Sequence, residues 1–112
     1  MHLRAGLMLC AALVAATTSP LLAQGSAAVG ATVYAAQKCG VCHSIAGVGN
    51  RRGALDNVGT RLTPEEIRLW IVDATGMTEK TKAPRRPVMR NYVLPAADLA
   101  ALVTYLASLK TP

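Results

Sequence analysis

The sequence lacks a long uninterrupted apolar run, and it has few cysteines, histidines and aromatic residues. Its most apolar stretch, Ala5 to Ala16, is followed by Thr, Thr, Ser and Pro at 17–20. It is therefore shorter than the roughly 20 residues that a membrane-spanning helix needs. The 112 residues include three Cys, two His, one Trp, three Tyr and no Phe. These shortages argue against a membrane anchor and against a disulfide framework.

The N-terminal segment has the pattern of an export signal. Arg4 gives a short positive region, the apolar stretch follows it, and Leu21-Leu22-Ala23 ends in a small residue suited to signal peptidase. We predict that residues 1–23 are removed, with an uncleaved anchor as the alternative. Residues 24–112 would then form one domain in the periplasm.

Cleavage would leave few candidate metal ligands, which are Cys39, Cys42, His43, Met77 and Met89. A tetrahedral zinc site normally takes four Cys or His ligands, more than this set supplies. No strand-like run precedes Cys39, although a thioredoxin-like dithiol enzyme would place its Cys pair after a buried strand. Zinc binding and dithiol exchange are therefore the less favoured interpretations.

The favoured interpretation comes from the spacing Cys39-Gly40-Val41-Cys42-His43. A Cys-x-x-Cys pair followed at once by His is typical of a c-type haem attachment site. The two sulfurs can add to the two vinyl groups of one porphyrin, and the His is placed to bind the iron through Nε2. We predict one covalently attached haem c, which leaves neither thiol for a structural disulfide. The sixth iron position falls to Met77, Met89, a weaker ligand such as Lys, or no ligand.

Three stretches of this small chain predict helices, and the rest predicts loops. The first helix runs from about Ala27 to Lys38, with Val29, Val33 and Ala36 on one face. Fewer than ninety residues bury only a modest share of their apolar surface, so such a domain usually needs a staple. A covalently held haem would supply it.

The middle helix has a clear start. Thr63 is the predicted N-cap, Pro64 takes the first helical position, and Glu66 completes a capping box. Gly76 is the predicted stop. The apolar stripe of this helix is Ile67, Trp70 and Ile71.

The last helix is predicted from Pro95 or Ala96 to about Lys110. Asp98 lies in its first turn and Lys110 in its last, and both charges suit the helix dipole. Its predicted buried face consists of Leu99, Leu102, Val103, Leu106 and Leu109.

With these elements, nearly the whole mature chain resembles the class I cytochromes c, the small soluble monohaem electron carriers. The likeness rests on the attachment site after the first helix, the helix that begins at Thr63 and ends near Asp73, a Met in a Pro-containing loop, and the closing segment 102–106. It implies an all-α fold of three main helices and loops around one haem. It also implies that Gly30 and Tyr34 meet Leu102 and Tyr105 where the first and last helices cross.

The same resemblance implies that Met89 is the sixth ligand. Met89 follows Pro84 and Pro87 in the loop before the last helix, which is the family arrangement, whereas Met77 lies just beyond the middle helix. One departure concerns the proximal side. The family usually has a Pro whose carbonyl accepts a hydrogen bond from the axial imidazole, and Ala54 takes that place here.

Charge points to the kind of partner. The formal net charge of +6 falls to +5 when Arg4 leaves with the leader. Such a basic chain favours redox proteins with acidic docking surfaces. Nucleic acid is a weaker alternative because no recognition motif is present, and a merely solubilising cluster is another. The basic residues that crowd the predicted ligand loop are Lys80, Lys82, Arg85, Arg86 and Arg90.

The predicted function depends on which groups bind the haem iron. If His43 and Met89 fill both axial positions, no substrate reaches the iron, and the protein is an electron carrier and not an enzyme. We predict a periplasmic carrier, a monomer without stable membrane insertion. The alternative is a small cytochrome subunit that accepts electrons from a periplasmic dehydrogenase or oxidoreductase complex. An enzyme or gas sensor with an open iron position is a third possibility.

Overall fold

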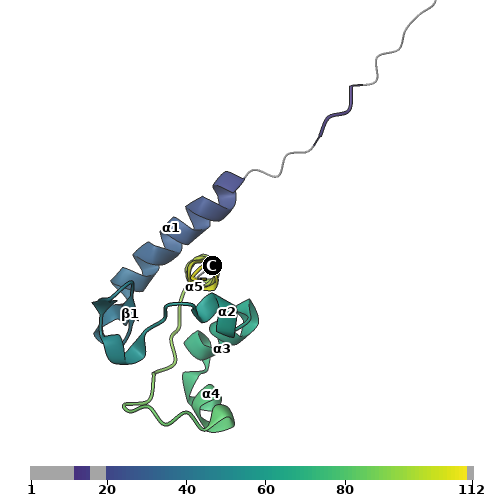
Figure 1. Ribbon diagram of the computed structural model, residues 1–112. Helices are drawn as coiled ribbons and strands as arrows, with labels where there is room; N and C mark the ends of the chain where they lie inside the picture. Colours follow the sequence, from purple (N-terminus) through teal and green to yellow (C-terminus); the bar gives the residue numbers. More distant parts are fainter. Residues whose placement is uncertain (1–11, 16–19, 111–112) are drawn as a thin grey trace, which may run out of the picture.

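The computed structural model describes residues 12–15 and 20–110, and this part of the chain is mostly helical (Figure 1). The all-α prediction is therefore confirmed at the level of fold class. The predicted leader lies mostly outside the described residues, so its removal stays a prediction. The elements in chain order are α1 (Pro20–Ala36), η1 (Cys39–Val41), β1 (Ser44–Ile45), β2 (Val48–Gly49), η2 (Arg51–Gly53), α2 (Val58–Arg61), α3 (Pro64–Val72), α4 (Ala74–Thr81) and α5 (Ala96–Ala107).

Three of the five described α-helices correspond to the predicted ones. These are α1, α3 and α5, whereas α2 and α4 were not predicted. Helix α1 begins at Pro20, before the predicted Ala27, and ends at Ala36, before the predicted Lys38. The two short strands form a single antiparallel hairpin, with Ser44 paired to Gly49 and Ile45 to Val48. None of the described helices is both long and apolar enough to cross a membrane.

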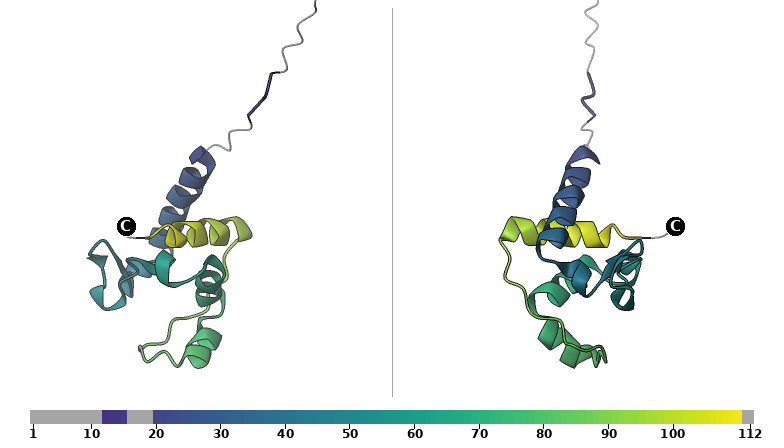
Figure 2. Two further views of the ribbon diagram at one scale, coloured as in Figure 1. Left: turned by 45° about the vertical axis from the view of Figure 1, so that its right-hand side comes forward. Right: turned by 90° about the vertical axis from the view of Figure 1, so that its left-hand side faces the viewer.

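Helices α1 and α5 cross in close contact, as both views of Figure 2 show. A Cβ added at Gly30 would overlap the Ala101 carbonyl oxygen and lie 2.5 Å from Tyr105 Cβ. The rings of Tyr34 and Tyr105 meet edge to face, with their centroids 6.1 Å apart. The predicted crossing is confirmed, with Gly30 against Ala101 and Tyr105 of α5.

The predicted buried face of α1 is wrong at two positions. Val33 is buried, but Val29 is 50% exposed and Ala36 is also exposed. The side that faces α5 carries Gly30, Val33 and Tyr34, which follow one another at helical spacing. Apolar residues occur around the whole of this Ala- and Val-rich helix, so their pattern does not fix which side is buried. The closest approach is made by a glycine, which hydrophobic periodicity ignores.

We expect Gly30→Ala to destabilise the protein, even though Ala is the better helix former. The new methyl group would have to push α1 away from the Ala101 backbone, because neither helix backbone can yield locally. Overpacking of this kind costs about 1–3 kcal/mol. Denaturant unfolding measures the loss, with the exposed Thr32→Ala on the same helix as control. Unchanged stability in Gly30→Ala would contradict the close crossing.

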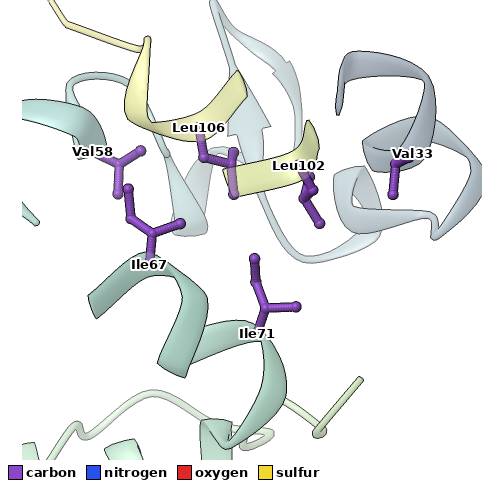
Figure 3. Close-up of a cluster of buried hydrophobic side chains, with 6 residues drawn as sticks. All are labelled: Val33, Val58, Ile67, Ile71, Leu102 and Leu106. Carbon is purple, nitrogen blue, oxygen red and sulfur yellow. The ribbon is translucent and has the colours of Figure 1, made fainter. Parts of the chain in front are cut away.

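The core lies between α5 and the helices around it (Figure 3). Ile67 and Ile71 point from α3 toward Leu102 and Leu106 of α5, and α1 and α2 each add one valine. The burial predicted for the five residues of the last helix is confirmed, because each belongs to this cluster or packs against it, although Leu109 lies beyond the end of α5. The six buried members of the cluster are Val33, Val58, Ile67, Ile71, Leu102 and Leu106.

The predicted end of the last helix is too late. Asp98 lies in the first turn as expected, but α5 ends at Ala107, so Lys110 is not in its last turn. After Ser108 the chain turns toward α2, where the Leu109 carbonyl accepts a hydrogen bond from the Gly59 N–H at 3.0 Å. This long-range bond takes the place of further helical turns.

The start of α3 is as predicted, and its end near Asp73 agrees with the family resemblance but not with the stop predicted at Gly76. The Thr63 side chain accepts from the Glu66 N–H at 3.2 Å, and the Glu66 carboxylate accepts from the Thr63 N–H at 2.8 Å. The helix ends at Val72 and not at Gly76. Asp73 instead caps the next helix, α4, by accepting from the Gly76 N–H at 3.2 Å. Gly76 belongs to the first turn of α4, where a Cβ would overlap the Asp73 carboxylate.

Candidate haem-binding site

A largely apolar cavity of about 760 Å³ lies between the Cys pair, α3, α5 and the loop between α4 and α5. The four side chains predicted to hold the cofactor, Cys39, Cys42, His43 and Met89, all line it. Its volume falls in the roughly 300–1,000 Å³ range of small-molecule and cofactor sites. The apolar walls include Leu55, Val58, Ile67, Trp70, Ile71, Leu102 and Leu106.

The two cysteines and the histidine lie in one tight turn directly after α1. Lys38 has a left-handed backbone (φ 56°) and turns the chain out of the helix. The Cys39 carbonyl then accepts hydrogen bonds from the N–H groups of Cys42, at 3.1 Å, and His43, at 2.9 Å. No disulfide joins the two cysteines, and burial raises the pKa of the half-buried Cys39. The motif is thus one compact unit at the edge of the cavity.

The His43 imidazole is held in the form that an iron ligand requires. Its Nδ1 lies 2.9 Å from the Gly53 carbonyl oxygen. Because a carbonyl only accepts, Nδ1 carries the hydrogen and the lone pair of Nε2 stays free. Burial lowers the pKa of His43, and the positive charge of Arg85 lowers it further, against the effect of the Gly53 bond. The neutral imidazole is therefore the favoured form.

The carbonyl that binds the imidazole belongs to Gly53 and not to Ala54, so the predicted acceptor is wrong. The Leu55 N–H donates to the Ser44 carbonyl at 2.8 Å, next to a bridge between Ser44 and Ala54. Within a trans peptide the C=O points opposite to the N–H, so the Ala54 carbonyl faces away from Ser44. The carbonyl one residue earlier, at the end of η2, takes the position beside His43.

The loop that carries Met89, residues 82–95, is fixed to the body of the protein beyond this residue. The Tyr92 N–H donates to the Ile71 carbonyl at 2.9 Å. The Asn91 side-chain oxygen accepts from the Thr75 N–H at 3.0 Å. These bonds attach the loop to the junction of α3 and α4, and Met89 is half-buried at the cavity. The sequence analysis missed all of these anchors, because each joins residues far apart in the chain.

Met77, the other candidate for the sixth position, lies elsewhere. It is buried within α4, 8% exposed, and it is not among the residues that line the cavity. Its carbonyl accepts from the Thr81 hydroxyl at 2.7 Å. The structure therefore brings Met89, and not Met77, to the same cavity as His43.

The predicted basic cluster is divided between the cavity and the surface beside it. Arg85 and Arg90 line the cavity, whereas Lys80, Lys82 and Arg86 do not. The Arg90 guanidinium lies 4.4 Å from the centroid of the Tyr92 ring, a cation–π contact. Two further basic residues, Lys38 and Arg61, also line the cavity and were missed by the sequence analysis. The cavity rim is therefore basic, with contributions from several elements.

Tyr34 also lines the cavity, and its hydroxyl oxygen is buried. Among the described residues its hydroxyl has no hydrogen-bond partner. Burial raises the pKa of Tyr34 to about 12 from its usual value of 10.0. The neutral phenol is thus held in the folded protein at a pH where the unfolded chain would release its proton.

We expect the free energy of unfolding to fall as the pH rises from about 10 to about 12. In this window the unfolded chain ionises Tyr34 while the folded protein keeps it neutral, so rising pH favours the unfolded state. Denaturant unfolding at several pH values in this window measures the slope of the free energy of unfolding against pH. Tyr34→Phe should reduce this slope. Tyr92→Phe leaves Tyr34 in place and should keep the slope. Equal slopes in the parent and Tyr34→Phe would refute the assignment.

A family model described as cytochrome c matches residues 27–110. A search of curated proteins and a search of solved structures each gave no match. The matched range contains the attachment sequence, the cavity and helices α2 to α5. Cytochrome c domains hold covalently attached haem c with its iron, and they transfer electrons between redox protein partners. Most of the sequence is thus accounted for by one family, and this chain belongs to the cytochrome c family.

Proposed function

We propose that this protein is a periplasmic one-electron carrier in which Cys39 and Cys42 bind haem c and His43 and Met89 are its axial ligands. The observation that supports this best is the convergence of these four side chains on one cavity. Three of them come from one turn of the chain. Met89 comes from a loop that is distant in sequence, and this loop is anchored beyond Met89 to α3 and α4.

The chain's own residues prepare the iron site. The Gly53 carbonyl, 2.9 Å from Nδ1, orients the His43 ring and keeps its Nε2 available for metal. A Met thioether in the sixth position favours the ferrous state and raises the reduction potential. With His43 and Met89 both bound to the iron, a substrate would have no access to the metal. These roles support electron transfer and not catalysis on a bound substrate.

The basic rim of the cavity supports partners with acidic docking surfaces. Lys38, Arg61, Arg85 and Arg90 all line the cavity and are exposed. Positive charge around a redox cofactor speeds the encounter with negatively charged partners, and salt weakens this effect. The export pattern of residues 1–23 supports the periplasm as the place of this encounter.

The closed iron site is tested with carbon monoxide. The untreated ferrous protein at neutral pH is expected not to bind it, because Met89 occupies the sixth position. Binding of carbon monoxide would instead favour an enzyme or a gas sensor with an open position. The ferrous form of Met89→Ala is the matched positive control, since it should bind carbon monoxide.

Purification from the periplasm under moderate salt distinguishes a free carrier from a dedicated subunit. A carrier is expected to elute alone, with the mass of one chain and one haem. Co-elution with a catalytic dehydrogenase would favour the subunit alternative. Recovery from the cytoplasm with residues 1–23 intact would contradict the proposed location.

A further inference from the structure

Arg85 connects the loop that carries Met89 to the opposite part of the cavity. Its guanidinium donates a hydrogen bond to the Cys42 carbonyl, although the two residues are far apart in sequence. The same guanidinium lies over Gly53, where an added Cβ would be 2.7 Å from Arg85 Cζ. Gly53 is the residue whose carbonyl holds the His43 ring. One side chain from the loop that carries Met89 thus contacts two backbone segments beside His43, one at Cys42 and one at Gly53.

The absence of a side chain at Gly53 makes this contact possible. Gly53 is buried, and a Cβ there would overlap both the Arg85 guanidinium and the Cys42 carbonyl oxygen. The backbone of η2 therefore leaves a space that the guanidinium fills. Arg86, which follows Arg85 in the chain, makes different contacts. Within the part of the chain that the structure describes, its guanidinium bonds only to its own loop, to the carbonyls of Ala83, at 3.2 Å, and Arg85, at 2.9 Å.

We propose that Arg85 is a positioning residue that fastens the Met89 loop to the Cys42–Gly53 side of the cavity and places a fixed positive charge beside the His43 ring. The inference rests on the proposed axial ligation by His43 and Met89. The loop has its other anchors at Asn91 and Tyr92, beyond Met89. Arg85 anchors it before Met89, so the ligand is held from both sides.

Two consequences can be separated by experiment. As a tether, Arg85 limits the opening of the loop, because a charge-assisted hydrogen bond must break before Met89 can leave. As a charge, it disfavours the ferric state, which carries one more positive charge than the ferrous state. Loss of the tether should therefore ease the replacement of Met89 by an external ligand. Loss of the charge should lower the reduction potential.

The test compares Arg85→Gln, Arg85→Lys and Arg86→Gln as purified ferric holoproteins. Cyanide is the probe, because its binding requires displacement of the sixth ligand. We expect Arg85→Gln to bind cyanide about tenfold faster than the parent, the scale of one lost hydrogen bond to a charged group, and to have a lower potential. Arg85→Lys keeps the charge without the planar fork, so cyanide binding should be faster with the potential almost unchanged. Arg86→Gln should match the parent in cyanide binding and potential.

Equal cyanide rates in the parent and Arg85→Gln would overturn the proposal, as would equal effects of Arg85→Gln and Arg86→Gln. If Arg85→Gln yields no holoprotein, the rate of Arg85→Lys decides alone. Failure of the proposed function is recognised separately, because the ferric Met–iron band of the parent would then be missing before any arginine is changed. A parent with this band and unresponsive arginine variants would reject the tether and leave the axial ligands in place.

Discussion

Replacement of both Cys39 and Cys42 by Ala is expected to give a secreted chain without covalently bound haem. Each thiol supplies one thioether link, and the mature chain predicted from the sequence has no other cysteine. The effect should be all-or-none on a denaturing gel stained for haem peroxidase activity, and mass spectrometry should give the mass of the polypeptide alone. We also expect poor recovery of folded protein, because the apolar cavity of about 760 Å³ would lose its covalent occupant.

Single variants and a leader variant serve as controls for this result. Cys39→Ala and Cys42→Ala each keep one thiol in the same turn, so a reduced stain is expected from each. Cys10→Ala changes a cysteine of the predicted leader and should leave the stain of the mature protein unchanged. Full staining of the double variant would refute the attachment assignment. The same conclusion would follow if the parent were colourless after export, with both thiols free to react.

Met89→Ala is expected to abolish the ferric Met–iron absorption band and to lower the reduction potential. The thioether would be replaced by water or a harder ligand, either of which stabilises the ferric state relative to the ferrous state. The expected change is on the order of tenths of a volt, within the roughly 0.8 V range over which axial ligands set haem potentials. Optical spectra of the ferric protein and a potentiometric titration measure the two effects.

Met77→Ala is the matched control, because the side chain is of the same kind but buried in α4. We expect it to keep the band and the potential, and to lose about 2–5 kcal/mol of stability as a large-to-small core substitution. The opposite pattern, with the band lost in Met77→Ala and retained in Met89→Ala, would transfer the ligand role to Met77. The pair of variants thus separates ligation from packing.

The start of α3 shows which parts of the fold the sequence can predict. Its capping box joins Thr63 to Glu66 within one turn, so residues close in sequence decide the geometry. The same is true of the attachment turn, in which the Cys39 carbonyl accepts from the N–H groups of Cys42 and His43. The buried face of α5 was also predicted, since its large aliphatic side chains lie on one side only.

Most of the errors arise from contacts between segments that are distant in the chain. The buried side of α1 is set by the approach of α5 to Gly30, a residue without a side chain to mark the position. Gly76 is a local exception: glycine often follows a helix and so predicts a stop, but here it makes room for the Asp73 cap of α4. The carbonyl that accepts from His43 is that of Gly53 and not the predicted Ala54, because the peptide after Ala54 pairs with Ser44.

The amino-acid sequence by itself determined the chemistry of attachment, because two thiols and an imidazole in one short turn need no other part of the chain to place them. It also determined the surplus of positive charge and the start of α3, which a local capping box marks. Only the tertiary structure decided which methionine shares a cavity with His43, which carbonyl orients that ring, and which arginine reaches across to Cys42. These depend on the path of the loop between α4 and α5, which is fixed by hydrogen bonds to distant backbone groups that no local pattern records.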